Sequence, residues 1–207
     1  MHSLVPGLTI DIDKRIPGLR SCVVISNHRS YLDPLILVTA FEKQATIVKS
    51  DFFRWPVFGW IIKSSGYIPS DAGGNLGSLL IERIKEMNDY LTGGGVLFVF
   101  PEGTRRQNGR IGPFNKGAFK IARRCNAPVE IVCLANTDKL FMPGRFFFST
   151  CIENRIEARW IGRISSEDVR RLPLDDLIAR AQRIMENNVG CHQGSQQIYS
   201  NDPNEPI

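Results

Sequence analysis

Short apolar runs rich in β-branched residues alternate along the chain with segments in which apolar residues recur every three or four positions. The first pattern predicts buried strands and the second predicts helices. The predicted strands are 19–27, 45–49, 96–100 and 129–134, with further strands near an edge at 146–152 and 156–162. The predicted helices are 35–41, 75–91, 114–125 and 175–188. This alternation indicates an α/β fold with a mostly parallel or mixed central sheet flanked by helices.

Two segments also indicate how deeply their helix or strand is buried, and one of them indicates where its helix begins. Proline disfavours α geometry in the preceding residue and suits the first helical position, so Asp33 is expected to cap a helix that begins at Pro34. The segment LILVTAF (35–41) is apolar all round, which predicts a buried helix. The run VLFVF (96–100) contains no polar residue, so both faces of this strand are expected to be covered.

Length and composition bound the organisation of the chain. Its 207 residues are most simply one domain, which we expect to span 1–189. Composition, with 43% apolar and 23% charged residues, is that of a globular protein. Residues 190–207 are polar and rich in Pro, Asn and Gln, which predicts a disordered tail.

The formal net charge of +5 favours an anionic partner, such as a phosphate-bearing substrate, a lipid surface or a nucleic acid. The sequence has neither a clustered basic face nor a nucleic-acid-binding motif, so a nucleic acid is not expected. We see no signal peptide, and the most apolar stretch, 52–62, is too short and too interrupted to span a bilayer. The chain is therefore expected to lie on a membrane without crossing it.

The five cysteines are scattered, without a CxxC motif or zinc-ligand spacing. This pattern fits a reducing compartment and predicts no metal site. Cys22 and Cys133 lie inside apolar runs and are expected to be core residues.

The segment NHRSYLDP (27–34) follows a predicted strand and offers candidate chemistry. His28 could accept a proton from a hydroxyl near neutral pH, and Asp33 could fix the tautomer of its ring. The alternative is that His28 is a solvated turn residue and Asp33 is only a helix cap. These two residues alone leave both interpretations open.

A second candidate, FPEGTR (100–105), also follows a buried strand. The backbone N–H of Gly103 and the side chains of Thr104 and Arg105 could surround one anion, since a guanidinium matches phosphate geometry. Glu102 could accept a hydrogen bond from a substrate hydroxyl or hold the arginine. Lys49, Lys116 and Lys120 would add positive charge at the same strand ends. An ordinary surface loop is the alternative.

Other common chemistries lack their motifs in this sequence. There is no G-x-S-x-G of a serine hydrolase and no G-x-x-x-x-G-K-[ST] or G-x-G-x-x-G phosphate-binding loop.

The blocks NHRSYLD and FPEGTRR, about 70 residues apart and in this order, resemble those of the glycerolipid acyltransferases typified by bacterial 1-acyl-sn-glycerol-3-phosphate acyltransferase. The similarity extends over about residues 8–165, and it implies that family's fold. It implies that His28 is the general base and Asp33 its orienting carboxylate. It further implies that Asn27 and Ser30 support the turn and that Glu102, Gly103, Thr104 and Arg105 bind substrate. Lys49, from its place after a predicted strand, is expected to bind substrate with them.

By the same resemblance, the acyl donor is acyl-CoA or acyl carrier protein, and no metal or bound cofactor is needed. The acceptor is a lysophospholipid, which suggests a peripheral enzyme at the cytoplasmic face of the membrane. The family's third block usually carries a phosphate-binding arginine where this chain has Ala72. The late strand also has Ile131 where the family has a proline. We expect no N-terminal membrane helix of the kind common in relatives.

The leading hypothesis is therefore acylation of lysophosphatidate to phosphatidate in phospholipid biosynthesis. Ala72 keeps open another acceptor, such as a lyso-ornithine-type aminolipid. A thioesterase that uses the same histidine to activate water and a non-catalytic lipid-binding protein are further alternatives. The aromatic segment 52–62 could lie at a lipid interface, line an acyl tunnel or belong to the core.

Overall fold

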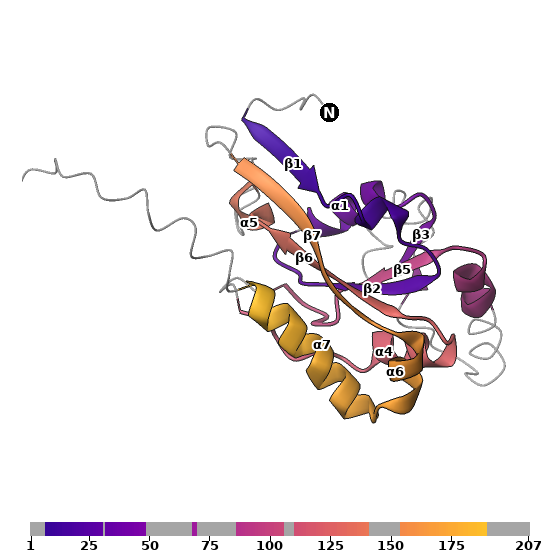
Figure 1. Cartoon of the computed structure of the whole chain (residues 1–207). Coiled ribbons are helices and arrows are strands. Elements are labelled where there is room, and N and C mark those ends of the chain that lie inside the picture. The colour runs from indigo at the N-terminus through magenta and orange to yellow at the C-terminus, as the bar shows by residue number, and fades with distance from the viewer. Residues whose placement is uncertain are drawn as a thin grey trace, which may run out of the picture.

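The computed structural model describes residues 7–30, 32–48, 68–69, 86–105, 110–140 and 154–189. Within these residues lies a seven-stranded sheet in the order β1-β7-β6-β2-β5-β3-β4 (Figure 1). The strands are β1 (Leu8–Ile12), β2 (Cys22–Ser26), β3 (Gln44–Val48), β4 (Ile68–Pro69), β5 (Val96–Val99), β6 (Val129–Ala135) and β7 (Asn154–Ile164). Neighbouring strands are parallel except β6 and β7, which are antiparallel. The predicted mixed α/β sheet is thus confirmed.

The centre of the sheet is formed by β5, β2 and β6, whose sequences are the most continuous apolar runs. Every residue of β2 and β6 is buried, as are the first three residues of β5. Strands buried on both faces need such runs, because side chains alternate between two covered sides. In β2, Val23 and Ile25 pack into one half of the core and Val24 packs into the other.

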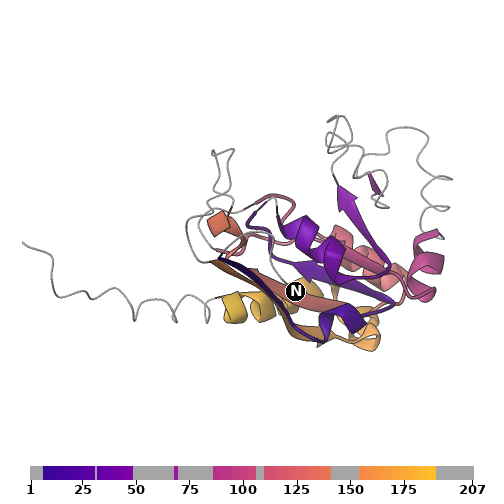
Figure 2. The ribbon, with the colours of Figure 1, turned by 90° about the horizontal axis from the view of Figure 1, so that it is seen from above.

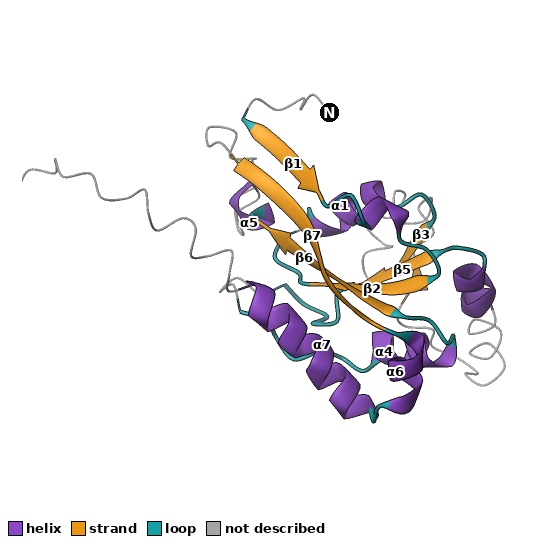
Figure 3. Ribbon diagram, viewed as in Figure 1, coloured by secondary structure: helices purple, strands orange, loops and turns teal. Residues whose placement is uncertain are grey.

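Helices cover both faces of the sheet. On one face lie α4 (Gly117–Arg124), α6 (Ser166–Arg171) and α7 (Leu174–Val189), and on the other lie α1 (Asp33–Ala40) and the short 3-10 helix η1 (Ile16–Gly18). Figure 1 shows α7 and α6 below the strands and α1 above them, and Figure 3 shows the same layers coloured by type. Seen from above in Figure 2, α1 lies in front of the strands.

Helix α1 differs from its prediction in two ways. Asp33 is its first helical residue, Leu32 occupies the N-cap position, and no side chain caps the helix there. The predicted N-cap role of Asp33 is therefore wrong, because its carboxylate bonds the preceding turn instead. The helix is also not buried all round: Ile36 and Leu37 are buried, whereas Leu35 is 41% exposed.

Strand β1 and helix α6 were not predicted from the sequence. Short strand β1 pairs in parallel with β7, so that β7 is the second strand from this edge. Helix α6 is capped by Ser165, whose side chain accepts a hydrogen bond from the Asp168 N–H. Several predictions lie outside the described residues: the strand at 146–152, the start of the helix at 75–91, the aromatic segment 52–62 and the tail 190–207.

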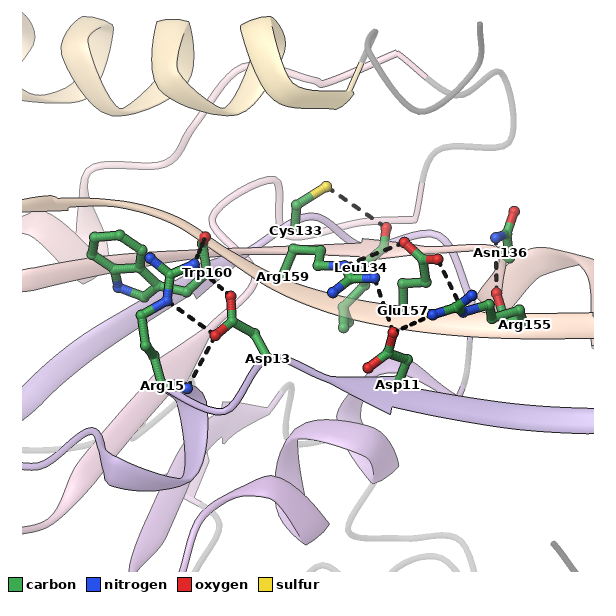
Figure 4. A network of polar contacts seen from close by, with 10 residues as sticks. All are labelled: Asp11, Asp13, Arg15, Cys133, Leu134, Asn136, Arg155, Glu157, Arg159 and Trp160. Carbon is green, nitrogen blue, oxygen red and sulfur yellow. Dashed lines mark hydrogen bonds and ion pairs between the residues drawn. The ribbon is translucent and has the colours of Figure 1, made fainter. Parts of the chain in front are cut away.

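A charged network joins β1 to β7 (Figure 4). The two acids Asp11 and Glu157 are paired across the strands, and Arg155 and Arg159 lie on either side of Glu157 along β7. Both arginines contact Asp11 Oδ2, at 2.6 and 2.9 Å, and these cations lower the pKa of Asp11 from its ordinary value. Opposite charge thus compensates the juxtaposed carboxylates on this strand pair.

No helix in the described ranges is long and apolar enough to span a bilayer.

Candidate active site

The candidate residues lie where β2 and β5 end, next to the end of β6. Since these three strands are parallel and adjacent, their carboxyl ends meet at one edge of the sheet. Ligand sites in α/β sheets form at this edge. The NHRSYLD block follows β2, and the FPEGTR block follows β5.

Asn27 ties the end of β2 to β6. Its side-chain Nδ2 donates to the Leu134 carbonyl at 2.9 Å, and its Oδ1 accepts from the Leu134 N–H at 2.7 Å. The last backbone pair of the two strands is Ser26 with Val132, so the amide extends the ladder beyond it. Asn27 is 1% exposed. This supporting residue therefore fixes the position from which His28 leaves the sheet.

His28 and Asp33 are in direct contact. His28 Nδ1 lies 3.0 Å from Asp33 Oδ2, with the histidine side chain 17% exposed and the aspartate side chain fully buried. An ionised carboxylate only accepts hydrogen bonds, so Nδ1 carries the proton in this contact and Nε2 of the neutral ring is left as the acceptor. The contact holds the ring in one orientation and leaves part of the side chain open to solvent.

The carboxylate of Asp33 also organises the turn that carries His28. Its Oδ2 accepts from the backbone N–H groups of Arg29 at 2.6 Å and Ser30 at 2.7 Å. The Ser30 carbonyl in turn accepts from the Asp33 N–H, and the buried Ser30 hydroxyl accepts from the Leu32 N–H. All of these side-chain contacts of Asp33 use Oδ2 and point back to the turn, whereas its Oδ1 is buried without a hydrogen-bond partner among the described residues.

An aromatic contact covers one face of the His28 ring. The rings of His28 and Phe100 are stacked, with centroids 4.3 Å apart and an angle of 22° between the planes. Phe100 directly follows β5, so this contact joins the first block to the start of the second.

The second block begins as a tight turn from Phe100 to Gly103. The Gly103 N–H donates to the Phe100 carbonyl at 3.1 Å, with Pro101 at the position that proline favours. Gly103 has φ of +66°, and a Cβ there would lie 2.9 Å from Asn115 Nδ2, so the position requires glycine. The N–H that was expected to face an anion is thus used by the turn in this structure, and binding of a ligand by Gly103 stays a prediction.

Glu102 is buried beneath this turn, with 7% exposure. Its Oε1 accepts from the His28 backbone N–H at 3.2 Å, and its Oε2 accepts from the Gly112 N–H at 2.8 Å. The predicted substrate-binding residue thus contacts the main chain on both sides. Thr104 is exposed and Arg105 partly exposed, as expected of groups that could meet a ligand.

The predicted cations are only partly described. Lys116 forms an ion pair with Asp175 at 2.8 Å, and Lys120 is exposed. Lys49 and Ala72 lie outside the described residues.

Arg29 is a neighbour of His28 that the sequence reasoning did not single out. Its guanidinium contacts Asp138 Oδ2 at 3.1 Å, and Asp138 belongs to the short helix α5 (Thr137–Leu140) after β6. Its position inside the NHRSYLD block was the sequence signal that could have pointed to Arg29 as a residue of the site. The ion pair joins the turn after β2 to the segment after β6.

The three buried cysteines of the described residues have raised pKa values. Burial raises the pKa of Cys133 to about 11 and that of Cys22 to about 12, and it also raises the pKa of Cys125. Since the thiolate is the reactive form, these three cysteines are poor nucleophiles.

Over the described ranges, no group of three or more His, Cys, Asp or Glu side chains is arranged to hold a metal ion.

Comparison with known proteins agrees with this geometry. The Acyltransferase family model matches residues 8–135. The chain belongs to this family. The matched residues include the turn after β2, the turn after β5 and all of β6.

Two curated plant relatives are chloroplastic enzymes. BAT2 of Brassica napus, a 1-acyl-sn-glycerol-3-phosphate acyltransferase, is 36% identical over 59% of this chain and 35% of its own length. LPAT1 of Arabidopsis thaliana, named for the same activity, is 33% identical over 69% of this chain and 40% of its own length. The chain therefore spans only about a third to two-fifths of the length of these relatives.

The fold also matches a solved structure. The crystal structure of PlsC from Thermotoga maritima, a 1-acyl-sn-glycerophosphate acyltransferase, has a TM-score of 0.68 over 93% of this chain and 74% of that chain. At 22% identity, this likeness shows the acyltransferase fold.

Proposed function

We propose that the protein is an O-acyltransferase that moves a fatty acyl group from a thioester to the free hydroxyl of 1-acylglycerol-3-phosphate, forming phosphatidate. The observation that carries this proposal is the contact between His28 Nδ1 and Asp33 Oδ2 at the edge of the sheet. Family membership and the names of the curated relatives support the reaction class and the acceptor.

In the proposed reaction, Nε2 of His28 takes the proton of the acceptor hydroxyl as its oxygen attacks the thioester carbonyl. Asp33 stabilises the imidazolium that forms and holds the ring in one tautomer. Collapse of the tetrahedral intermediate breaks the carbon–sulfur bond, and the imidazolium returns its proton to the departing thiolate. The products are the acylated lipid and the free thiol of coenzyme A or acyl carrier protein.

Direct transfer of this kind needs no covalent acyl-enzyme. The raised pKa values of Cys22, Cys125 and Cys133 support direct transfer, since none of these three thiols is an available nucleophile that could carry the acyl group. The proposal likewise requires no metal or bound cofactor. Thr104 and Arg105, at the end of β5, are the proposed phosphate ligands, and Lys49 is proposed to add a further cation.

The acceptor lipid is proposed to enter from a membrane surface at its cytoplasmic face, with the protein bound peripherally. The net charge of +5 favours anionic lipid, and Leu35 presents an exposed apolar side chain in the first turn of α1. Asp33 begins the same helix, so this side chain lies close in sequence to the proposed base.

Ala72 favours a second candidate acceptor. It stands where the resembling family carries a phosphate-binding arginine, which would reduce the preference for lysophosphatidate over another lyso-lipid, such as a lyso-ornithine-type aminolipid.

The test is mass spectrometry of lipids formed by the purified protein from mixed acyl-CoA and acyl carrier protein donors and a panel of lysolipids. Phosphatidate as the main product supports the proposal, and an acylated aminolipid supports the second candidate. Release of free fatty acid with no acylated lipid would replace both with a thioesterase. Binding of vesicles without turnover of any donor would indicate a lipid-binding protein.

A further inference from the structure

Glu102 joins two segments that are far apart in the sequence. One carboxylate oxygen accepts the N–H of His28, 74 residues earlier in the chain, and the other accepts the N–H of Gly112. Both contacts are to main-chain atoms, so they depend on backbone position and not on the neighbouring side chains. Hydrogen bonds between an ionised carboxylate and backbone N–H groups are stronger than those between neutral groups.

Glu102 is buried, unlike Thr104, which follows it in the same loop. Glu102 is 7% exposed, whereas Thr104 is exposed at the surface of the same loop. A carboxylate that contacts a substrate hydroxyl must be reachable by that substrate. Glu102 instead lies under the turn, between the two backbone segments.

The turn after β5 restrains His28 through two independent contacts. Phe100 stacks against its ring, and Glu102 binds its backbone N–H. Asp33 supplies the third restraint, on Nδ1. The ring of a base has to be placed well within 1 Å, because a displacement of about 1 Å can reduce a catalytic rate about 100-fold.

We propose that Glu102 is a positioning residue, which fixes His28 through its backbone N–H and does not itself hold the acceptor. This inference rests on the proposed acyl transfer for its kinetic consequence. Its structural content, that Glu102 anchors the His28 and Gly112 amides, holds whatever the reaction is.

The experiment compares Glu102→Gln with Glu42→Gln in the whole 207-residue chain. Glutamine keeps the size of the side chain but has one acceptor oxygen, so its NH2 group faces one of the two backbone N–H donors. Glu42 has a side chain that is 82% exposed, and it pairs with Arg20, which makes it a matched surface control. For Glu102→Gln we expect kcat to fall 10- to 100-fold while KM for lysophosphatidate changes less than twofold. For Glu42→Gln we expect neither parameter to change.

Hydrogen exchange measured by mass spectrometry provides a readout that needs no activity. In Glu102→Gln, the peptide that contains the amide facing the new NH2 group, that of His28 or that of Gly112, should exchange at least 10-fold faster, with the rest of the sheet unchanged. If this variant does not fold, Glu102→Asp is used, which keeps the charge but is too short to reach both amides.

The outcomes distinguish a residue that positions His28 from one that binds the acceptor. A KM that rises 10-fold or more with unchanged kcat would overturn the proposal, because it would place Glu102 on the acceptor. Unchanged exchange at both amides would also overturn it. If the wild-type protein transfers no acyl group, the proposed function fails, and the exchange measurement still decides the role of Glu102.

Discussion

Replacing Asn27 with alanine would test how the sheet holds the candidate base. The substitution removes both hydrogen bonds between the Asn27 amide and the backbone of Leu134, a residue with 0% exposure. The Leu134 N–H and C=O groups would then be buried without these partners. His28 follows Asn27 directly, so the same change loosens the start of its turn.

The magnitude follows from the number of groups left unpaired. Each buried polar group without a partner costs about 1–3 kcal/mol, so two of them predict a loss of about 2–6 kcal/mol in the free energy of unfolding. Asn154→Ala is a matched control, because the 5% exposed Asn154 donates through its side chain to one backbone carbonyl, that of Asn136, at 3.0 Å. Its expected loss is about half as large.

Urea denaturation at 25 °C, followed by tryptophan fluorescence, measures both losses. The expected result is a decrease in the midpoint with an unchanged slope, larger for Asn27→Ala than for Asn154→Ala. A loss below about 1 kcal/mol for Asn27→Ala would refute the reasoning, because it would mean that the amide adds nothing to the β2–β6 ladder.

Two further variants test the turn after β5 and the attachment of β1. Gly103→Ala should lower the free energy of unfolding by about 1–3 kcal/mol, since alanine is strained at positive φ and its Cβ meets Asn115. Gly117→Ala, where a Cβ meets nothing within 4 Å, serves as its control in thermal denaturation, and equal melting temperatures for the two variants would contradict the argument. The Arg15 side chain holds the pKa of Asp13 well below its usual range, so this carboxylate stabilises the fold above the unfolded-state pKa of about 3.9 and loses that effect as the pH falls further. Asp13→Asn should therefore lower the melting temperature at pH 7 and lower it less at pH 3, and a difference independent of pH would count against this ion pair.

The central strands and the two blocks were predictable because their signals are local. The apolar runs of β2, β5 and β6 are long enough to mark strands covered on both faces, and this order of strands and helices indicates an α/β fold. Local sequence left the pairing of His28 with Asp33 open, and the resemblance of the two blocks to the acyltransferases implied it. The 3.0 Å contact confirms that the two side chains meet.

The partners of the other polar groups depend on contacts far apart in the sequence. Nothing local to Glu102 shows that it will meet the His28 amide, 74 residues away, and nothing in β1 reveals its pairing with β7. The direction in which Asp33 points was also not predictable, because capping a helix and closing the preceding turn both suit an aspartate before proline. The contact of Glu102 and the pairing of β1 depend on the assembled sheet, and the direction of Asp33 depends on the exact path of the turn.

The most direct test of the account is acyl transfer by His28→Ala. With radiolabelled acyl-CoA and lysophosphatidate, and with folding checked by circular dichroism, the variant should lose activity by about 100- to 10,000-fold, as expected when a general base is removed. Near-normal turnover by the folded variant would contradict the central claim that His28, oriented by Asp33, deprotonates the acceptor hydroxyl.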